Sequence, residues 1–398
     1  MQRTSSPRPL TVVGAVLAIV VVVVVAVFFF RDRYYQSQAA PPAADVAQTP
    51  AVELPPPGPP ACGQGDALLQ QMTMRQKLAQ LLMVGVTGLD DARQVVARDQ
   101  VGGIMIGSWT DLSMMGDPVK ELAASASPLP LAVSTDEEGG RVSRLKELIG
   151  EQQAPRYLAQ SNTPDQVYAI ARDRGVAMRN LGVTIDFAPV VDVSSQPDDT
   201  VIGDRSFGAD AQTVIDYAGA YSRGLRDAGV MPVLKHFPGH GSANGDSHLG
   251  GVTTPPLSAL MTSDLVPYRQ LLGPGTAVMV GHMFVPELTD DVQSSLSPAA
   301  YGLLRSGGYG GPPFDGLVFT DDLSSMGAIN QTYTVPEAVL KSLQAGADVA
   351  LWITTDEVPA VLDRLESAVQ AGELDPARVD QSVLRVAAAK GTKPDCGG

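Results

Sequence analysis

The sequence predicts an α/β protein whose folded part is a single (β/α)8 TIM-like barrel, preceded by a transmembrane helix and a Pro/Ala-rich linker. Short apolar, often β-branched runs alternate with stretches of helical periodicity, which is the pattern of βαβ units in a parallel sheet. There are eight such runs, and most of them end in a charged residue or a histidine, as strands do at the site-bearing end of a parallel barrel. Both observations count against the alternative, an open doubly wound sheet.

The first element is an uncharged apolar run from Leu10 to Phe30. About 20 apolar residues suffice to cross a bilayer as a helix, and the flanking basic residues weakly favour a cytoplasmic N-terminus. We therefore expect residues 1–33 to form a cytoplasmic stub and a single-pass membrane anchor, with the rest of the chain extracytoplasmic. The alternative is a cleaved signal segment and secretion, because residues 38–40 offer a weak cleavage site.

The second element, residues 34–61, is rich in Pro and Ala and almost uncharged, so we expect an extended spacer that holds the folded domain away from the membrane. The folded domain then covers residues 62–398. Cys62 and Cys396 lie near its two ends. An exported chain with an even number of cysteines can form a disulfide, and a closed barrel brings its termini together, so these two residues are a candidate disulfide. The alternative is two unrelated thiols near the ends of the domain.

The barrel itself is predicted from the runs that follow. Helical periodicity is clearest over 166–180, 211–228 and 335–345. The eight predicted strands cover 81–86, 103–106, 131–134, 183–187, 232–236, 277–281, 317–320 and 349–353.

Polar residues follow five of these strands in succession. A buried charge is costly unless it is paired or ligated, so a series of them at strand ends is hard to explain as packing. In parallel barrels these ends carry the active site. The residues are Asp136, Asp186, Lys235 with His236, His282, and Asp321 with Asp322.

A second set of polar residues lies on a loop. Asp246 and His248 are two residues apart in a Gly/Ser/Asn-rich stretch. A carboxylate beside an imidazole orients it and stabilises its protonated form, which suits proton transfer near neutral pH. Asp321 is then free to act as a nucleophile or an electrostatic stabiliser.

Zinc binding is the competing interpretation of the histidine-rich region. His236, His240, His248 and Asp246 supply suitable ligand types. Their spacing fits no common zinc pattern, and Pro and Gly at 238–239 keep the first two histidines off one helix. The sequence gives no evidence for a metal or an organic cofactor.

The composition limits the remaining function classes. With 398 residues, of which 44% are hydrophobic, the chain is long enough for one sizeable core. Its net charge of −15 repels phosphate backbones, so no nucleic-acid partner is expected.

Three motifs carry a resemblance to a known family. They are Asp-Glu-Glu-Gly-Gly-Arg-Val within 136–144, Lys-His-Phe-Pro-Gly-His-Gly and Asp-Ser-His within 235–248, and Phe-Thr-Asp-Asp-Leu-Ser-Ser-Met-Gly-Ala at 319–328. Over residues 65–390 the chain resembles glycoside hydrolase family three, in its bacterial β-N-acetylglucosaminidase (NagZ-type) branch. The pair Ser324-Ser325 departs from the family pattern, where a single Ser before Met is expected.

The resemblance implies a retaining exo-hydrolase built on one barrel domain. By this resemblance Asp321 is the nucleophile, His248 the acid/base and Asp246 its partner. The residues implied to bind the sugar are Asp136, Arg144, Arg205, Lys235 and His236.

The chemistry implied is double displacement, in which a glycosyl-enzyme ester forms on Asp321 and water then hydrolyses it. This requires Asp321 and His248 to meet across one pocket mouth. A nucleophilic substrate acetamido group oriented by the Asp321-Asp322 pair is the chemical alternative. Phosphate in place of water as acceptor, a related β-glucosidase, and a non-catalytic wall-binding protein are the other hypotheses.

Location and family together suggest the substrate. A tethered enzyme of this branch would meet small cell-wall oligosaccharides or muropeptides, such as GlcNAc-MurNAc fragments released in peptidoglycan turnover. We expect a monomer whose other contact is with the membrane, through its N-terminal helix.

Overall fold

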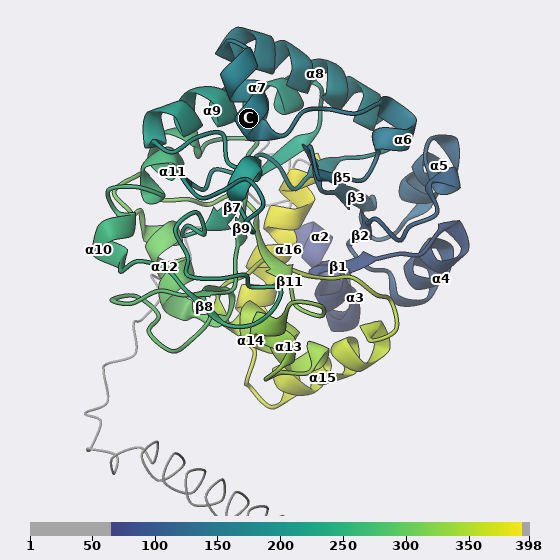
Figure 1. Ribbon diagram of the computed structural model, residues 1–398. Coiled ribbons are helices and arrows are strands. Elements are labelled where there is room, and N and C mark those ends of the chain that lie inside the picture. Colours follow the sequence, from purple (N-terminus) through teal and green to yellow (C-terminus); the bar gives the residue numbers. More distant parts are fainter. Residues whose placement is uncertain (1–64, 392–398) are drawn as a thin grey trace, which may run out of the picture. The chain divides into compact units, whose positions relative to one another are not determined.

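The computed structural model describes residues 65–391, and a closed barrel of eight parallel strands forms the centre of this region (Figure 1). The strands follow one another in the order β1-β12-β11-β9-β7-β6-β3-β2. Each lies at one of the predicted apolar runs, so the predicted (β/α)8 barrel is confirmed. The bounds are β1 (Leu82–Gly85), β2 (Gly103–Ile106), β3 (Ala132–Thr135), β6 (Ile185–Asp186), β7 (Met231–Phe237), β9 (Ala277–Val280), β11 (Val318–Asp322) and β12 (Val349–Trp352).

The helices surround this barrel (Figure 1). Those predicted at 166–180, 211–228 and 335–345 are present as α8, α9 and α14. The helices are α2 (Gly65–Gln70), α3 (Met74–Ala79), α4 (Leu89–Asp99), α5 (Asp117–Ser125), α6 (Lys146–Ile149), α7 (Pro155–Ser161), α8 (Pro164–Asn180), α9 (Ala211–Asp227), α10 (Leu257–Leu260), α11 (Leu265–Leu271), α12 (Pro298–Ser306), α13 (Gly327–Asn330), α14 (Val335–Ala345), α15 (Val358–Gln370) and α16 (Pro376–Ala389), with short 3-10 turns η1 (Leu112–Met114), η2 (Gly203–Arg205) and η3 (Ser294–Leu296).

Local sequence signals explain where the longest helices begin. Thr163 accepts a hydrogen bond from the backbone of Gln166, whose side chain bonds back to Thr163, and Pro164 occupies the first turn of α8. This capping box satisfies two backbone N–H groups that have no partner within the helix. Asp210 caps α9 in a similar way by accepting from Thr213 N–H.

The barrel interior is filled by side chains, as in a packed core. Most of its strands are buried along their whole length, which is typical of parallel strands covered on both faces. Phe187 and Phe319, from opposite parts of the sequence, meet edge to face with ring centres 5.4 Å apart. The barrel is therefore a rigid support for side chains at its ends.

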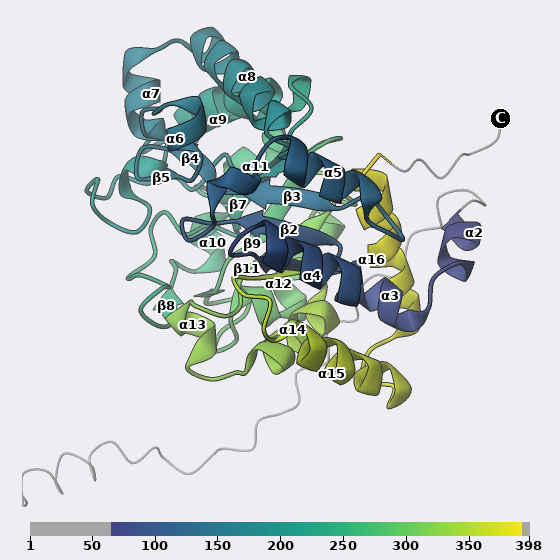
Figure 2. The ribbon, with the colours of Figure 1, turned by 90° about the vertical axis from the view of Figure 1, so that its right-hand side faces the viewer.

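Two small sheets lie at the end of the barrel opposite α2 and α3 (Figure 2). One is the antiparallel hairpin of β4 (Glu137–Gly139) and β5 (Val142–Ser143), and the other pairs β8 (Val252–Thr253) with β10 (Met283–Phe284). The β4–β5 hairpin follows the carboxyl end of β3, and β10 follows that of β9. They build the rim on which the predicted site residues stand.

The predicted anchor (1–33), the linker (34–61), Cys62 and Cys396 all lie outside the described residues. Within residues 65–391, no helix has the length and apolar character needed to cross a membrane. The anchor and the disulfide stay predictions.

Candidate active site

The carboxyl ends of the barrel strands open into a cavity of about 330 Å³. Its size suits a small ligand. A larger cavity of about 630 Å³, lined partly by Lys120, Arg226 and Lys390, contains none of the predicted site residues. The smaller cavity brings together all eight of them: Asp136, Arg144, Arg205, Lys235, His236, Asp246, His248 and Asp321.

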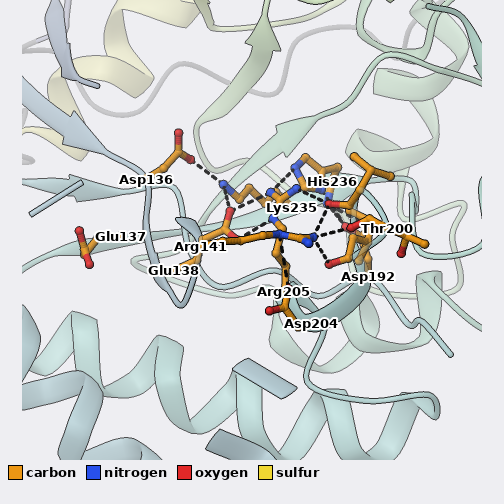
Figure 3. A network of polar contacts seen from close by, with 12 residues as sticks. Asp136, Glu137, Glu138, Arg141, Asp192, Thr200, Asp204, Arg205, Lys235 and His236 are labelled. Atoms are coloured by element: carbon orange, nitrogen blue, oxygen red, sulfur yellow. Dashed lines mark hydrogen bonds and ion pairs between the residues drawn. The ribbon is translucent and has the colours of Figure 1, made fainter. Parts of the chain in front are cut away.

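The three acidic residues that follow β3 point to different partners (Figure 3). Asp136 accepts a hydrogen bond from Lys235 Nζ at 2.6 Å, on the cavity side. Glu137 turns away from the cavity and binds Arg174 Nη2 at 2.5 Å. Glu138 points to the cavity again. Asp136 and Glu138 therefore line the cavity, and Glu137 between them is structural.

Glu138 forms the centre of a buried charge cluster. Arg205 donates to both of its carboxylate oxygens at 2.8 Å, and Lys235 Nζ lies 2.6 Å from Glu138 Oε1. Burial alone would raise the pKa of Glu138, but the charges of Arg205 and Lys235 hold it well below its usual range. Burial likewise opposes protonation of Lys235, yet Asp136 and Glu138 raise its pKa. The cluster is thus ionised at neutral pH.

Glu137 shapes the hairpin that carries Arg144. Its carboxylate accepts the backbone N–H groups of Arg144 and Leu145, at 2.8 and 2.7 Å. Nε of Arg144 is buried without a hydrogen-bond partner among the described residues. A donor left unpaired beside a cavity is suited to a ligand oxygen.

Two buried histidines of the site, His236 and His240, share Asp192 as a hydrogen-bond partner. His236 Nδ1 lies 2.7 Å from Asp192 Oδ2, and Asp192 Oδ1 accepts the backbone N–H of His240 at 2.7 Å. Since a carboxylate only accepts, Nδ1 carries the proton and Nε2 of His236 faces Arg205 Nη2 at 3.5 Å. Burial lowers the pKa of His240 to about 4, so that imidazole is neutral at neutral pH.

Asp321 and Asp322 are adjacent in β11 but have separate surroundings. Successive strand residues point to opposite sides, and only Asp321 lines the cavity. Burial would raise the pKa of Asp321, but the imidazoles of His236 and His282 and the backbone N–H of Asp322 lower it to about 2. Asp321 is therefore a carboxylate at any pH near neutrality.

Asp322 instead holds the turn that follows. Its carboxylate accepts from the backbone and hydroxyl of Ser324, both at 2.8 Å, and from the backbone of Ser325 at 3.1 Å. The Ser325 hydroxyl also donates to it. Both residues of the Ser324-Ser325 pair thus hydrogen-bond to Asp322 in this turn.

Asp246 and His248 form the predicted dyad. Nδ1 of His248 lies 2.7 Å from Asp246 Oδ1, which also accepts the backbone N–H of His248 at 2.9 Å. Burial would raise the pKa of Asp246, but these two hydrogen bonds lower it, so Asp246 is ionised. Nδ1 must then be the donor, which leaves Nε2 free to exchange a proton.

The histidines considered as zinc ligands each have a contact within the chain. Each histidine of the proposed zinc set already has its own partner: His236 binds Asp192, His240 lies 3.0 Å from Ser247 Oγ, and His248 binds its aspartate. Within residues 65–391, no group of three or more His, Cys, Asp or Glu side chains is placed to hold an ion.

Two of the polar strand ends do not reach the cavity. Asp186 is fully buried and accepts the backbone N–H of Glu137 at 2.9 Å. His282 bridges Ser295 Oγ, at 2.6 Å, and the backbone oxygen of Asp322, at 2.8 Å. Both residues support site-bearing backbone, and neither lines the site.

Sequence reasoning missed three residues of the site. Glu138 stood inside a recognised motif, next to two other acids, and nothing in that motif indicates which of them faces the cavity. Asp192 follows an apolar stretch whose Val190 pairs in parallel with Lys235, and this pairing brings Asp192 beside His236. His240 was considered only as a zinc ligand.

Comparison with known proteins identifies the family. The family described as glycosyl hydrolase family 3 N terminal domain matches residues 73–389. Beta-hexosaminidase LpqI of Mycobacterium tuberculosis is 60% identical over 352 residues, which are 88% of this chain and 91% of that protein.

Solved structures show the same similarity. A glycosyl hydrolase of the GH3 family from Mycobacterium smegmatis shares 67% identity with a TM-score of 0.80, over 83% of this chain and 99% of that one. A family 3 β-N-acetylglucosaminidase from a Paenibacillus species shares 35% identity with a TM-score of 0.75, over 82% and 64%.

Proposed function

This chain belongs to glycosyl hydrolase family 3, and from that premise we propose that it is an exo-acting, retaining β-N-acetylglucosaminidase. It is a hydrolase of the β-hexosaminidase type, like its relative at 60% identity. One observation carries the finer proposal: an ionised carboxylate, Asp321, and a carboxylate-bound imidazole, His248, line the same small cavity. A nucleophile and a proton donor at one pocket are the two groups that double displacement needs.

In the first step Asp321 attacks the anomeric carbon and the glycosidic bond breaks. Its pKa of about 2 keeps the attacking oxygen unprotonated. His248, protonated at both ring nitrogens and held through Nδ1 by Asp246, gives the Nε2 proton to the leaving oxygen. The product is a glycosyl ester on Asp321 and a neutral imidazole.

In the second step the neutral imidazole takes a proton from water, which attacks the ester and frees the sugar with its configuration retained. A neutral base does not repel a small anion. Phosphate is therefore the second candidate acceptor, and product analysis in phosphate buffer distinguishes a sugar phosphate from free N-acetylglucosamine.

The chain's own carboxylate is favoured over a nucleophilic acetamido group of the substrate. That chemistry uses an Asp pair that orients the acetamido group. Here Asp322 is occupied by the hydrogen bonds of Ser324 and Ser325 and lies on the other side of the strand. Only Asp321 of the pair faces the sugar.

The cavity floor supplies the groups that would hold the terminal sugar. Asp136, which accepts from Lys235 through Oδ1, is an acceptor for hydroxyls on one side, and Lys235 and Arg205 are the cations beside it. Arg144 adds the unpaired Nε. A cavity of about 330 Å³ is at the small end of the range for ligand pockets, which supports binding of one terminal sugar and hence exo action.

The cell-wall substrate is a further part of the proposal. The apolar run 10–30 and the spacer 34–61 support an enzyme tethered outside the cytoplasm, where GlcNAc-MurNAc fragments are its substrate. Secretion after cleavage of the leader is the alternative.

The experiment compares wild type with Asp321→Ala on a fluorogenic β-N-acetylglucosaminide and on the matching β-glucoside. We expect hydrolysis of the first substrate only, and its loss in the variant. A 5-fluoro glycosyl fluoride should label the peptide that contains Asp321. Equal rates on both sugars would indicate a glucosidase, and a trapped enzyme without label at Asp321 would contradict the proposed nucleophile.

A further inference from the structure

The loop that carries His248 is docked onto the segment that follows the nucleophile strand. We propose that this contact, centred on Gly327, sets the position of His248 relative to Asp321, so that Gly327 is a positioning residue of the reaction. The inference rests on the proposed roles of these two side chains. It adds a residue that touches neither the sugar nor the reacting atoms.

The contact consists of backbone hydrogen bonds. Gly327 N–H donates to the backbone oxygen of His248 at 3.0 Å, and Ala328 N–H donates to that of Ser247 at 3.1 Å. Gln331 Nε2 adds a bond to Leu249 O at 3.1 Å. The first N–H groups of a helix have no partner within it, so the start of α13 has two donors available for this loop.

Glycine at 327 is what allows so close an approach. A Cβ placed there would lie 2.7 Å from the carbonyl carbon of Leu249 and 2.8 Å from its oxygen. These are backbone atoms and cannot rotate away as the end of a side chain can. Any larger residue at 327 must therefore push the 247–249 loop off α13.

The segment between Asp321 and Gly327 is itself fixed. The carboxylate of Asp322 ties the backbone of Ser324 and Ser325, at 2.8 and 3.1 Å. Gln293 Nε2 holds the backbone oxygen of Ala328 at 2.7 Å from another part of the chain. The nucleophile is thus connected to the docking surface by a short, braced stretch.

The dyad has few other supports. The side chains of His248 and Asp246 are 56% and 37% exposed, so packing does not hold the imidazole in place. Ser247 Oγ lies 3.0 Å from His240 Nε2 at the base of the loop, and Leu249 N–H donates to the backbone oxygen of Asp246 at 3.0 Å within it. The position of the acid/base group is therefore set largely by the loop backbone and its contact with α13.

The test is Gly327→Ala, with Gly250→Ala as the matched control. A Cβ at Gly250 meets nothing within 4 Å, although this residue belongs to the same loop. Both variants are assayed on an activated aryl glycoside and on a GlcNAc disaccharide with a poor leaving group. A displaced proton donor matters only for the poor leaving group. We therefore expect roughly a 10-fold loss of kcat/KM on the disaccharide for G327A, part of the ~10²–10⁴-fold that general acid catalysis supplies, and near wild-type rates for G250A.

His248→Ala separates this inference from the proposed function. If that variant is equally impaired on both substrates, the acid role of His248 is wrong. If it shows the leaving-group dependence but G327A behaves as G250A does, only the positioning role of Gly327 is refuted. A general loss of folding in G327A would appear as a lower Tm and equal losses on both substrates. In that case Gln331→Ala tests the positioning role, because it removes only the bond to Leu249. It should show a smaller loss of kcat/KM than G327A, confined to the disaccharide. If Q331A loses the same fraction of wild-type kcat/KM on both substrates, or loses none on either, the inference is overturned.

Discussion

Replacing Glu138 by Gln tests the buried charge cluster directly. The substitution keeps the shape of the side chain but removes the charge that Arg205 and Lys235 share. Lys235 retains Asp136 at 2.6 Å, whereas Arg205 loses the carboxylate to which it donates twice. One buried guanidinium is thus left without its counter-charge.

The expected cost follows from burial. The side chain of Glu138 is 0% exposed and that of Arg205 is 10% exposed, so water compensates little. Removing one partner of a buried pair costs about 3–5 kcal/mol, because the other charge stays buried and unpaired. For a domain of this size, 3 kcal/mol lowers Tm by on the order of 5 °C.

The assay is thermal unfolding of E138Q beside wild type, with Glu147→Gln as the control. Glu147 is exposed on α6 and should change Tm by less than about 1 °C. The pKa of Glu138 is lowered in the folded state, so its stabilisation is present above the unfolded pKa and is lost as the pH falls below about 4. The Tm difference between wild type and E138Q should therefore narrow in acid. A variant as stable as E147Q at pH 7 would refute the reasoning.

Three further predictions concern the proposed catalytic groups, and a fourth concerns the turn that Asp322 holds. His248→Ala should reduce kcat/KM by ~10²-fold or more on poor leaving groups and far less on activated aryl glycosides, and added azide should restore turnover of the latter as a glycosyl azide. Asp246→Asn should reduce kcat/KM on poor leaving groups by roughly 10-fold, because the imidazole loses the carboxylate that holds it through Nδ1, while an unchanged kcat/KM would contradict the dyad. With a pKa of about 2, Asp321 should not produce an acidic limb above about pH 3 in the rate of its labelling by a 5-fluoro glycosyl fluoride. A labelling rate that falls by half near pH 5 would contradict that value. Asp322→Ala removes the acceptor of Ser324 and Ser325 and should cost about 2–4 kcal/mol in unfolding experiments.

The charge cluster and the dyad divide the site into two parts of different rigidity. Asp136, Glu138, Arg205 and Lys235 are tied together from three separate strand ends and loops, so the floor proposed to bind the sugar is preorganised. His248 stands on an exposed loop.

Several features followed from the sequence because they depend on neighbouring residues. The eight apolar runs were located to within about two residues, since a strand buried on both faces requires a continuous apolar stretch. The start of α8 is marked by Thr163, Pro164 and Gln166, all within one turn. The same holds for the Asp246–His248 dyad, whose two members are two residues apart on one loop.

The tertiary structure decided which charges meet. Glu138 and Arg205 are separated by 67 residues, His236 and Asp192 by 44, and no local pattern indicates such pairs. The structure also gives Asp322 its role: Asp321 lines the cavity, whereas the carboxylate of Asp322 accepts hydrogen bonds from the turn that follows the strand.

The sequence by itself therefore determined the barrel, the motifs and the types of chemical group available, because periodicity and short-range spacing are properties of consecutive residues. Only the folded chain determined the partner of each carboxylate and the direction in which it points. Those depend on strand register and on which loops the barrel brings side by side, and electrostatic interactions fall off too quickly with distance to be assigned without that geometry.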